Sequence, residues 1–113
     1  MLIKNITKKR IIAENAVLCN DLTKYIGLMF SFKQKNSLVF RFDNEQNIAL
    51  HMFFVFYPID VLFLDKNKTV VDMKENFRPF TAYVSKKKAI YAVELPSGAV
   101  KITKTQIGDE IGF

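Results

Sequence analysis

The stretch Ile48–Asp65, IALHMFFVFYPIDVLFLD, is the most apolar part of the chain and decides its fold class. A helix that crosses a bilayer needs about 20 predominantly apolar residues, and a carboxylate at the bilayer centre costs roughly 2.5–3.5 kcal/mol. Pro58 and Asp60 interrupt this stretch, and proline breaks a helix or a strand ladder because it lacks an amide hydrogen. The sequence therefore predicts a water-soluble protein with two buried strands, Ile48–Phe56 and Ile59–Leu64.

Shorter patterns on both sides of this stretch also predict strands. Alternating or continuous apolar runs bounded by turn residues favour strands at Ile11–Ala13, Ala16–Cys19, Leu38–Phe42, Thr69–Met73 and Ala89–Leu95, with a last short strand after Gly108-Asp109. Asp43–Asn47 is predicted to be a polar turn, and Ala99–Thr103 a short helix or strand. One short helix is predicted between Asn20 or Asp21 and Gly27. We therefore predict a mainly β, compact single-domain barrel or sandwich with one short helix in its N-terminal half.

Length and composition narrow the class of protein further. The 113 residues correspond to one domain, 1–113, and a hydrophobic share of 50% excludes a disordered chain. One Cys excludes an internal disulfide, and one His with one Cys excludes zinc sites built only from these residues. We expect neither a metal nor a cofactor. The start of the chain has no secretory signal pattern, which predicts a cytoplasmic protein outside the membrane.

The chain is basic, with 17 Lys plus Arg against 11 Asp plus Glu, so that 17 − 11 gives a formal charge of +6. Lys8–Arg10 and Lys86–Lys88 are the densest clusters, and Lys86, Lys87 and Lys88 are the candidates for nucleic-acid contacts. RNA-binding strands place Lys, Arg and Gly between exposed aromatic residues, whereas the aromatic residues here lie among Met, Val, Ile and Leu. Solvated lysines are the favoured interpretation, and nucleic-acid binding is a further alternative.

Three ionisable residues stand out in apolar strands. Asp60 shares a strand face with Leu62 and Leu64, so its carboxylate either accepts backbone amides and fastens a neighbouring loop or lies in a ligand pocket. His51 is predicted to be a satisfied core residue, with a ligand or catalytic role as the alternative. Glu94 lies near the end of an apolar strand. Asp60 and Glu94 could form an acid and base pair if their carboxyl groups lie close together.

Nucleophile and phosphate motifs are absent from the sequence. Ser97 lies in Pro96-Ser97-Gly98, which lacks the Gly-x-Ser-x-Gly elbow, and Cys19 has no local catalytic signature. The four glycines are scattered and form no phosphate-binding loop. These absences favour a protein without catalytic activity.

An ordered set of short motifs from about Ala16 to Phe113 resembles the domain of unknown function 192 family, also called uncharacterised protein family 0127. The matching pieces are Gly27-Leu28-Met29-Phe30, Ser37–Phe40, Pro58–Asp65, Val70-Val71, Val93–Gly98 and Gly108-Asp109. The resemblance implies a mostly β domain with a small helix and no known reaction. It makes Asp60, Glu94 and Gly98 candidates for the family's pocket. Many relatives have Trp-Met-Lys-Asn-Thr where this chain has His51–Val55, so those polar side chains are missing here.

Together, these observations favour a small non-catalytic module that binds a small ligand or a protein partner. The candidate ligand-binding residues are Asp60, Glu94, Gly98 and His51. The alternatives are a carboxylate-based enzyme that uses Asp60 and Glu94, and nucleic-acid binding through the lysine clusters. We expect a monomer or a weak dimer.

Overall fold

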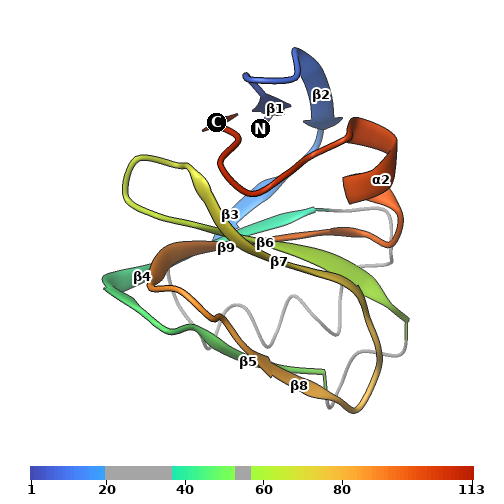
Figure 1. The fold of residues 1–113 in the computed structure, drawn as a ribbon. Coiled ribbons are helices and arrows are strands. Elements are labelled where there is room, and N and C mark those ends of the chain that lie inside the picture. Colours follow the sequence, from blue (N-terminus) through green and yellow to red (C-terminus); the bar gives the residue numbers. More distant parts are fainter. Residues whose placement is uncertain (20–36, 53–56) are drawn as a thin grey trace.

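A five-stranded sheet forms the centre of the computed structural model, which describes residues 1–19, 37–52 and 57–113 (Figure 1). Its strands, in spatial order, are β3 (Val17–Cys19), β4 (Leu38–Gln46), β9 (Ala89–Pro96), β6 (Ile59–Leu64) and β7 (Val70–Phe77). The β3–β4 pair is parallel and the other pairs are antiparallel. All six residues of β6 are buried, which explains why its sequence is an unbroken apolar run apart from Asp60.

Two smaller sheets flank the central one. A three-stranded sheet of β10 (Ile111–Gly112), β1 (Ile3–Asn5) and β2 (Arg10–Ala13) lies at one end, beside the short helix α2 (Ala99–Thr103). A two-stranded sheet of β5 (Ala49–His51) and β8 (Ala82–Val84) lies on the opposite side (Figure 1). The sheets do not close into a barrel, so the predicted mainly β class is confirmed in its sandwich form.

The central sheet separates two hydrophobic cores. On the side of α2, Leu62 and Leu64 of β6 pack with Val100 and Ile111. On the side of β5 and β8, Val61 and Phe63 of the same strand pack with other buried residues, among them Leu50, Met52 and Phe77. The alternation predicted for β6 is confirmed, because odd-numbered and even-numbered residues enter different cores.

Several predictions about the elements need correction. Asp43–Asn47 was predicted to be a turn, but β4 continues to Gln46, which pairs with Ala89 across an irregular register. The polar residues are compatible with a strand because the end of β4 is exposed. Ile48–Phe56 was predicted to be buried on both faces, yet Ala49 and His51 are exposed. β5 belongs to a two-stranded sheet with only one face on the core, so its other face meets solvent.

The remaining predictions divide into confirmed elements and those outside the described residues. The strands expected around Ile11, Ala16, Ile59, Thr69 and Ala89 are present, and Ala99–Thr103 is a helix. The helix expected before Gly27 and the second half of Ile48–Phe56 lie outside the described residues. Within the described ranges, the structure contains no helix with the length and apolar character needed to cross a bilayer.

Candidate functional site

Asp60, the first candidate, is 1% exposed and accepts three hydrogen bonds from backbone amides. Its Oδ1 atom accepts the amide of Asn76 at 2.9 Å. Its Oδ2 atom accepts the amides of Gly98 at 3.1 Å and Val100 at 3.0 Å. The carboxylate therefore joins β6 to two other segments, β7 and the start of α2, and these contacts agree with the structural interpretation of Asp60.

The three amides belong to positions that need an external acceptor. Gly98 is the N-cap of α2, has a positive φ of 94° and carries no side chain, so Asp60 supplies the oxygen that an N-cap side chain ordinarily provides. The negative charge also lies at the helix N-terminus, where the backbone amides favour an anion. Asn76, with φ of 49°, lies in the bulged part of β7 between the residues paired with Ile59 and Val61. Asp60 thus stabilises both the start of α2 and this bulge.

Glu94, the proposed partner of Asp60, lies on the opposite face of the central sheet. In the β6–β9 pair, Asp60 is opposite Leu95, whereas Glu94 is opposite Val61. Side chains of opposite residues share a face, so Asp60 points to the α2 side with Leu95 and Glu94 points to the other side with Val61. The backbone of the sheet therefore lies between the two carboxyl groups, and they do not form the side-by-side pair that an acid and base mechanism requires.

Glu94 is instead close to Tyr57. Burial raises the pKa of the Tyr57 hydroxyl, and the negative charge of Glu94 raises it further. Glu94 is itself buried, which agrees with its position among the apolar side chains on that face. The structure therefore places Glu94 with Tyr57 and away from Asp60 and Gly98.

His51 lies in a third location, on the two-stranded sheet, where it pairs with Ala82 of β8. It is exposed, so the prediction that it is a core residue was wrong. The apolar residues next to it in the sequence suggested burial, but the outer face of β5 is open to solvent. Asp60, Glu94 and His51 therefore point in three different directions and do not converge on one site.

The lysine candidates Lys86, Lys87 and Lys88 are exposed in the loop between β8 and β9. The backbone amide of Lys86 donates to Asp72 at 2.8 Å, which fixes the start of this loop. In the described ranges, the one ion pair of the chain is between Lys8 and Asp109, so none of these three ammonium groups is paired there.

Asp72, which the sequence analysis missed, is a second buried carboxylate with three hydrogen bonds. Its Oδ2 atom accepts the Tyr83 hydroxyl at 2.7 Å as well as the Lys86 amide, and its Oδ1 atom accepts the amide of Met73 at 2.8 Å. Burial by itself raises the pKa of Asp72, but the hydrogen bonds outweigh it and hold this pKa below its ordinary value. Burial, followed by the hydrogen bond and the charge of Asp72, raises the pKa of Tyr83 to about 12.

The raised pKa of Tyr83 predicts a loss of stability in alkali. A tyrosine in the unfolded chain ionises near 10.0 and Tyr83 near 12, so the stabilisation is complete below pH 10 and is lost as pH rises to about 12. Tyr83→Phe should lower the free energy of unfolding by about 1 kcal/mol at neutral pH, because Asp72 loses one donor. The difference between wild type and variant should shrink from pH 10 to 12 in urea unfolding. Tyr91→Phe, which removes a hydroxyl without touching Asp72, is the control; equal pH profiles for both variants would contradict this assignment.

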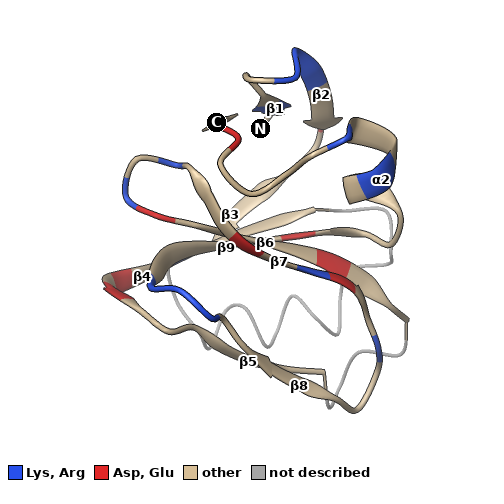
Figure 2. Cartoon of the chain, viewed as in Figure 1, with Lys and Arg blue, Asp and Glu red and all other residues tan. Residues whose placement is uncertain are grey.

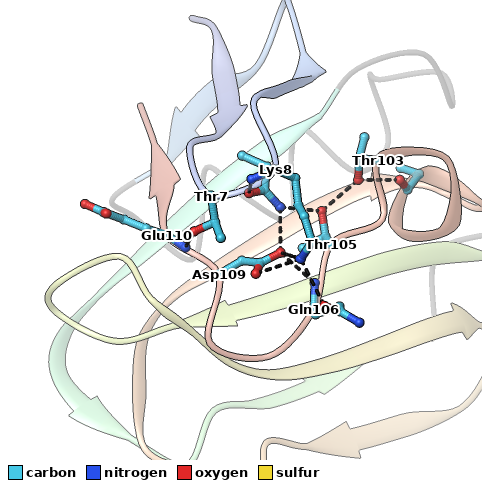
Figure 3. Close-up of polar contacts among 9 residues, drawn as sticks. Thr7, Lys8, Thr103, Thr105, Gln106, Asp109 and Glu110 are labelled. Carbon is cyan, nitrogen blue, oxygen red and sulfur yellow. Dashed lines mark hydrogen bonds and ion pairs between the residues drawn. The ribbon is translucent and has the colours of Figure 1, made fainter.

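Asp109 is the centre of a third polar cluster, which the sequence analysis also missed (Figure 3). Its carboxylate accepts hydrogen bonds from the Asn5 side chain at 2.9 Å, from Lys8 Nζ at 2.7 and 2.9 Å, and from the Gln106 amide at 2.9 Å. Asn5 also donates to Thr105 Oγ1 at 3.1 Å. Burial alone raises the pKa of Asp109, but the bonds from Asn5, Lys8 and Gln106 outweigh it and lower this pKa. The cluster joins β1 to the segment before β10.

Asp72 could have been identified as a candidate from the sequence. It is a carboxylate inside an apolar strand, as Asp60 is, although only the fold shows that Tyr83 and Lys86 approach it. Asp109 lies in the Gly108-Asp109 turn, and nothing local indicates its contact with Asn5 104 residues away. Among the residues that the structure describes, no group of three or more His, Cys, Asp or Glu side chains could hold a metal ion.

Comparison with known proteins gives the same family as the motifs. The family model DUF192, described as "Uncharacterized ACR", matches residues 3–113, nearly the whole chain. The chain belongs to the DUF192 family. A UPF0127 protein of Pyrococcus furiosus is 36% identical over 110 residues, which cover 95% of this chain and 93% of that protein. A UPF0127 protein of Thermococcus sibiricus is 40% identical over 92 residues, and the match spans 80% of this chain but only 59% of that protein.

Solved structures share the fold of this DUF192 chain. A crystal structure of a candidate transcription regulator from Sinorhizobium meliloti has a TM-score of 0.81 and 21% identity, and the match covers 98% of this chain and 89% of that one. A protein of unknown function from Novosphingobium aromaticivorans also has a TM-score of 0.81, with 16% identity, and the match covers 99% of this chain and 82% of that one. At these identities the likeness shows a common fold, and the DUF192 family remains uncharacterised.

Proposed function

We propose that this protein is a cytoplasmic, non-catalytic domain that binds a protein partner, as a monomer or a weak dimer. The observation that carries the proposal is that the buried aspartates form their hydrogen bonds with groups of the protein itself. Asp60, Asp72 and Asp109 each accept at least three hydrogen bonds from the protein's own donors. A general acid or base must instead reach a proton on the substrate.

The positions of the other carboxylate candidates support the same proposal. Asp60 and Glu94 lie on opposite faces of the central sheet, an arrangement that disfavours the paired mechanism that the sequence left open. Large hydrophobic side chains are exposed at several places, including Phe80, Val84, Ile102 and Ile107. Exposed apolar side chains of this kind contribute to protein–protein contacts when they are grouped. Cys19, the one cysteine of the sequence, is a buried thiol, which is compatible with the reducing cytoplasm.

A substrate screen tests the absence of catalysis. The purified protein is expected to give no turnover above a no-protein blank with ester, phosphate, glycoside and peptide substrates. Asp60→Asn and Glu94→Gln are the informative variants for any signal, because they keep the shape of each side chain and remove its charge. Turnover that disappears in either variant, while the variant remains folded by circular dichroism, would show that the protein is an enzyme.

A further inference from the structure

The outer face of the two-stranded sheet is an exposed apolar surface. Ala49 is opposite Val84 and His51 is opposite Ala82, so these four side chains lie on one face of the β5–β8 pair. All four are exposed, and Val84 is 55% exposed. The intervening residues Leu50 and Tyr83 point inward and belong to the core. We call the four exposed side chains the β5–β8 face.

Basic residues lie at both ends of β8, the strand that forms half of this face. Arg78 precedes β8, and Lys86, Lys87 and Lys88 follow it, and all four are exposed. Residues 78–88 contain no acidic residue, so this segment carries a charge of +4. Figure 2 shows basic residues in the connections on both sides of β8. A ligand that extends along β8 would therefore meet positive charge at each end.

The lysine loop is held in a fixed position relative to the β5–β8 face. Asp72 accepts hydrogen bonds from both the Tyr83 hydroxyl and the Lys86 amide, so one buried carboxylate joins β8 to the start of the loop. Ser85, between them, donates its backbone amide to Ile48 and its hydroxyl to the carbonyl of Lys87. Because these bonds order the backbone before any ligand arrives, binding would require little additional ordering.

We propose that the β5–β8 face binds an extended acidic segment of a protein partner, an inference that rests on the proposed function as a binding domain. Apolar side chains of the segment would contact Ala82 and Val84, and its carboxylates would approach Arg78 and the lysine loop. Charge complementarity of this kind accelerates association and selects partners of the opposite charge. Asp43 and Glu45 lie on the neighbouring end of β4, where Gln46 pairs with Ala89, and they limit the basic surface on that side.

An acidic peptide fits this surface better than a single-stranded nucleic acid does. Proteins that bind single strands stack successive bases on aromatic side chains. The β5–β8 face instead presents the small aliphatic side chains of Ala49, Ala82 and Val84, and the Tyr83 ring points inward, 5.7 Å from the Phe63 ring. Within residues 78–88 the exposed aromatic side chain is Phe80, in the turn before β8, and a single ring cannot stack successive bases. A strand-like peptide can place alternate side chains on such a surface.

Fluorescence anisotropy with a labelled synthetic peptide tests the proposal on the whole chain. The probe alternates Glu and Val over about eight residues, which at roughly 3.3 Å per residue is longer than the three-residue strand β8 and can reach past both of its ends. We expect saturable binding at low salt that weakens as salt is added. Lys86→Glu with Lys87→Glu should weaken binding at least about tenfold, and Val84→Glu should weaken it by a similar factor.

Matched variants at the other end of the molecule are the controls. Lys101→Glu with Lys104→Glu reverses the same number of exposed charges, and Ile107→Glu replaces an apolar residue that is 61% exposed. Both should bind the peptide within about twofold of wild type. The proposal is overturned if the wild type does not bind the peptide at low salt, if the control variants lose as much affinity as the test variants, or if an oligothymidine binds more tightly. None of these results requires turnover, so the proposed function could stand while this surface assignment fails.

Discussion

Asp60→Ala is expected to lower the free energy of unfolding by about 3 kcal/mol or more. The substitution leaves the amides of Asn76, Gly98 and Val100 without their acceptor. The Val100 bond is buried and the other two are partly buried, and a buried unsatisfied donor costs roughly 1–3 kcal/mol. It also removes a negative charge from the N-terminus of α2. Urea unfolding measures the loss, and a lower midpoint with an unchanged slope would show that stability, rather than the compactness of either state, has changed.

Asp65→Ala is the matched control for Asp60→Ala. Asp65 also accepts two backbone amides with one carboxylate oxygen, those of Asn67 and Thr69, but it lies in a half-buried turn where water can replace it. We expect it to lower stability by about 1 kcal/mol. If Asp60→Ala costs no more than Asp65→Ala, the carboxylate of Asp60 does not hold α2 and the β7 bulge as we describe.

Asp60→Asn separates the charge from the shape of the side chain. One oxygen can still accept an amide hydrogen, but the new NH₂ group faces amides that also donate, so we expect most of the loss found for Asp60→Ala. Since Asp60 is buried on the α2 side of the central sheet, the acidic peptide should bind folded Asp60→Asn as it binds wild type. This pair of results would show that Asp60 acts in stability and not in binding.

The central strands could be predicted from the sequence because their signals are local. In β6, the alternation between Ile59 and Leu64 is sufficient to assign each residue to one of two faces, and both faces are buried. The strand-end position of Asp60 gave acceptance of backbone amides as one of two interpretations, and the hydrogen bonds agree with that one. The identity of those amides was not predictable, since Gly98 and Val100 lie 38 and 40 residues away.

The features that the sequence did not predict depend on how strands pair. β8 has only three residues, too few to show a period, and it is defined by its pairing with β5. His51 was assigned to the core from its neighbours, because nothing local indicates that β5 joins a two-stranded sheet with one exposed face. The placement of Asp60 and Glu94 on opposite faces follows from the register of β6 with β9, which single-strand patterns do not contain.

The second large effect is expected at Asp109 in acid. Because the folded protein lowers the pKa of this carboxyl, its charge stabilises the fold fully above the pKa of an unfolded aspartate, about 3.9. That stabilisation should be lost as pH falls from about 5 through the lowered folded value. Asp109→Asn should cost about 2–3 kcal/mol at pH 7, because the buried side-chain amide of Asn5 and the partly buried ammonium of Lys8 lose a charged acceptor. Below pH 4 the difference from wild type should become smaller.

Acid also destabilises the wild type through Asp72, because the folded protein lowers the pKa of that carboxyl as well. Two further variants separate the contribution of Asp109 from this general effect of acid. Glu110→Gln removes an exposed carboxylate next to Asp109 and should change the free energy of unfolding at pH 7 by no more than about 0.5 kcal/mol. Lys8→Met keeps the Asp109 carboxylate but removes its ion pair, so the acid transition should move to higher pH. If Asp109→Asn and wild type lose stability in parallel between pH 5 and 3, the charge of Asp109 is not what joins β1 to the segment before β10. If they converge, one carboxylate connects parts of the chain that are 104 residues apart.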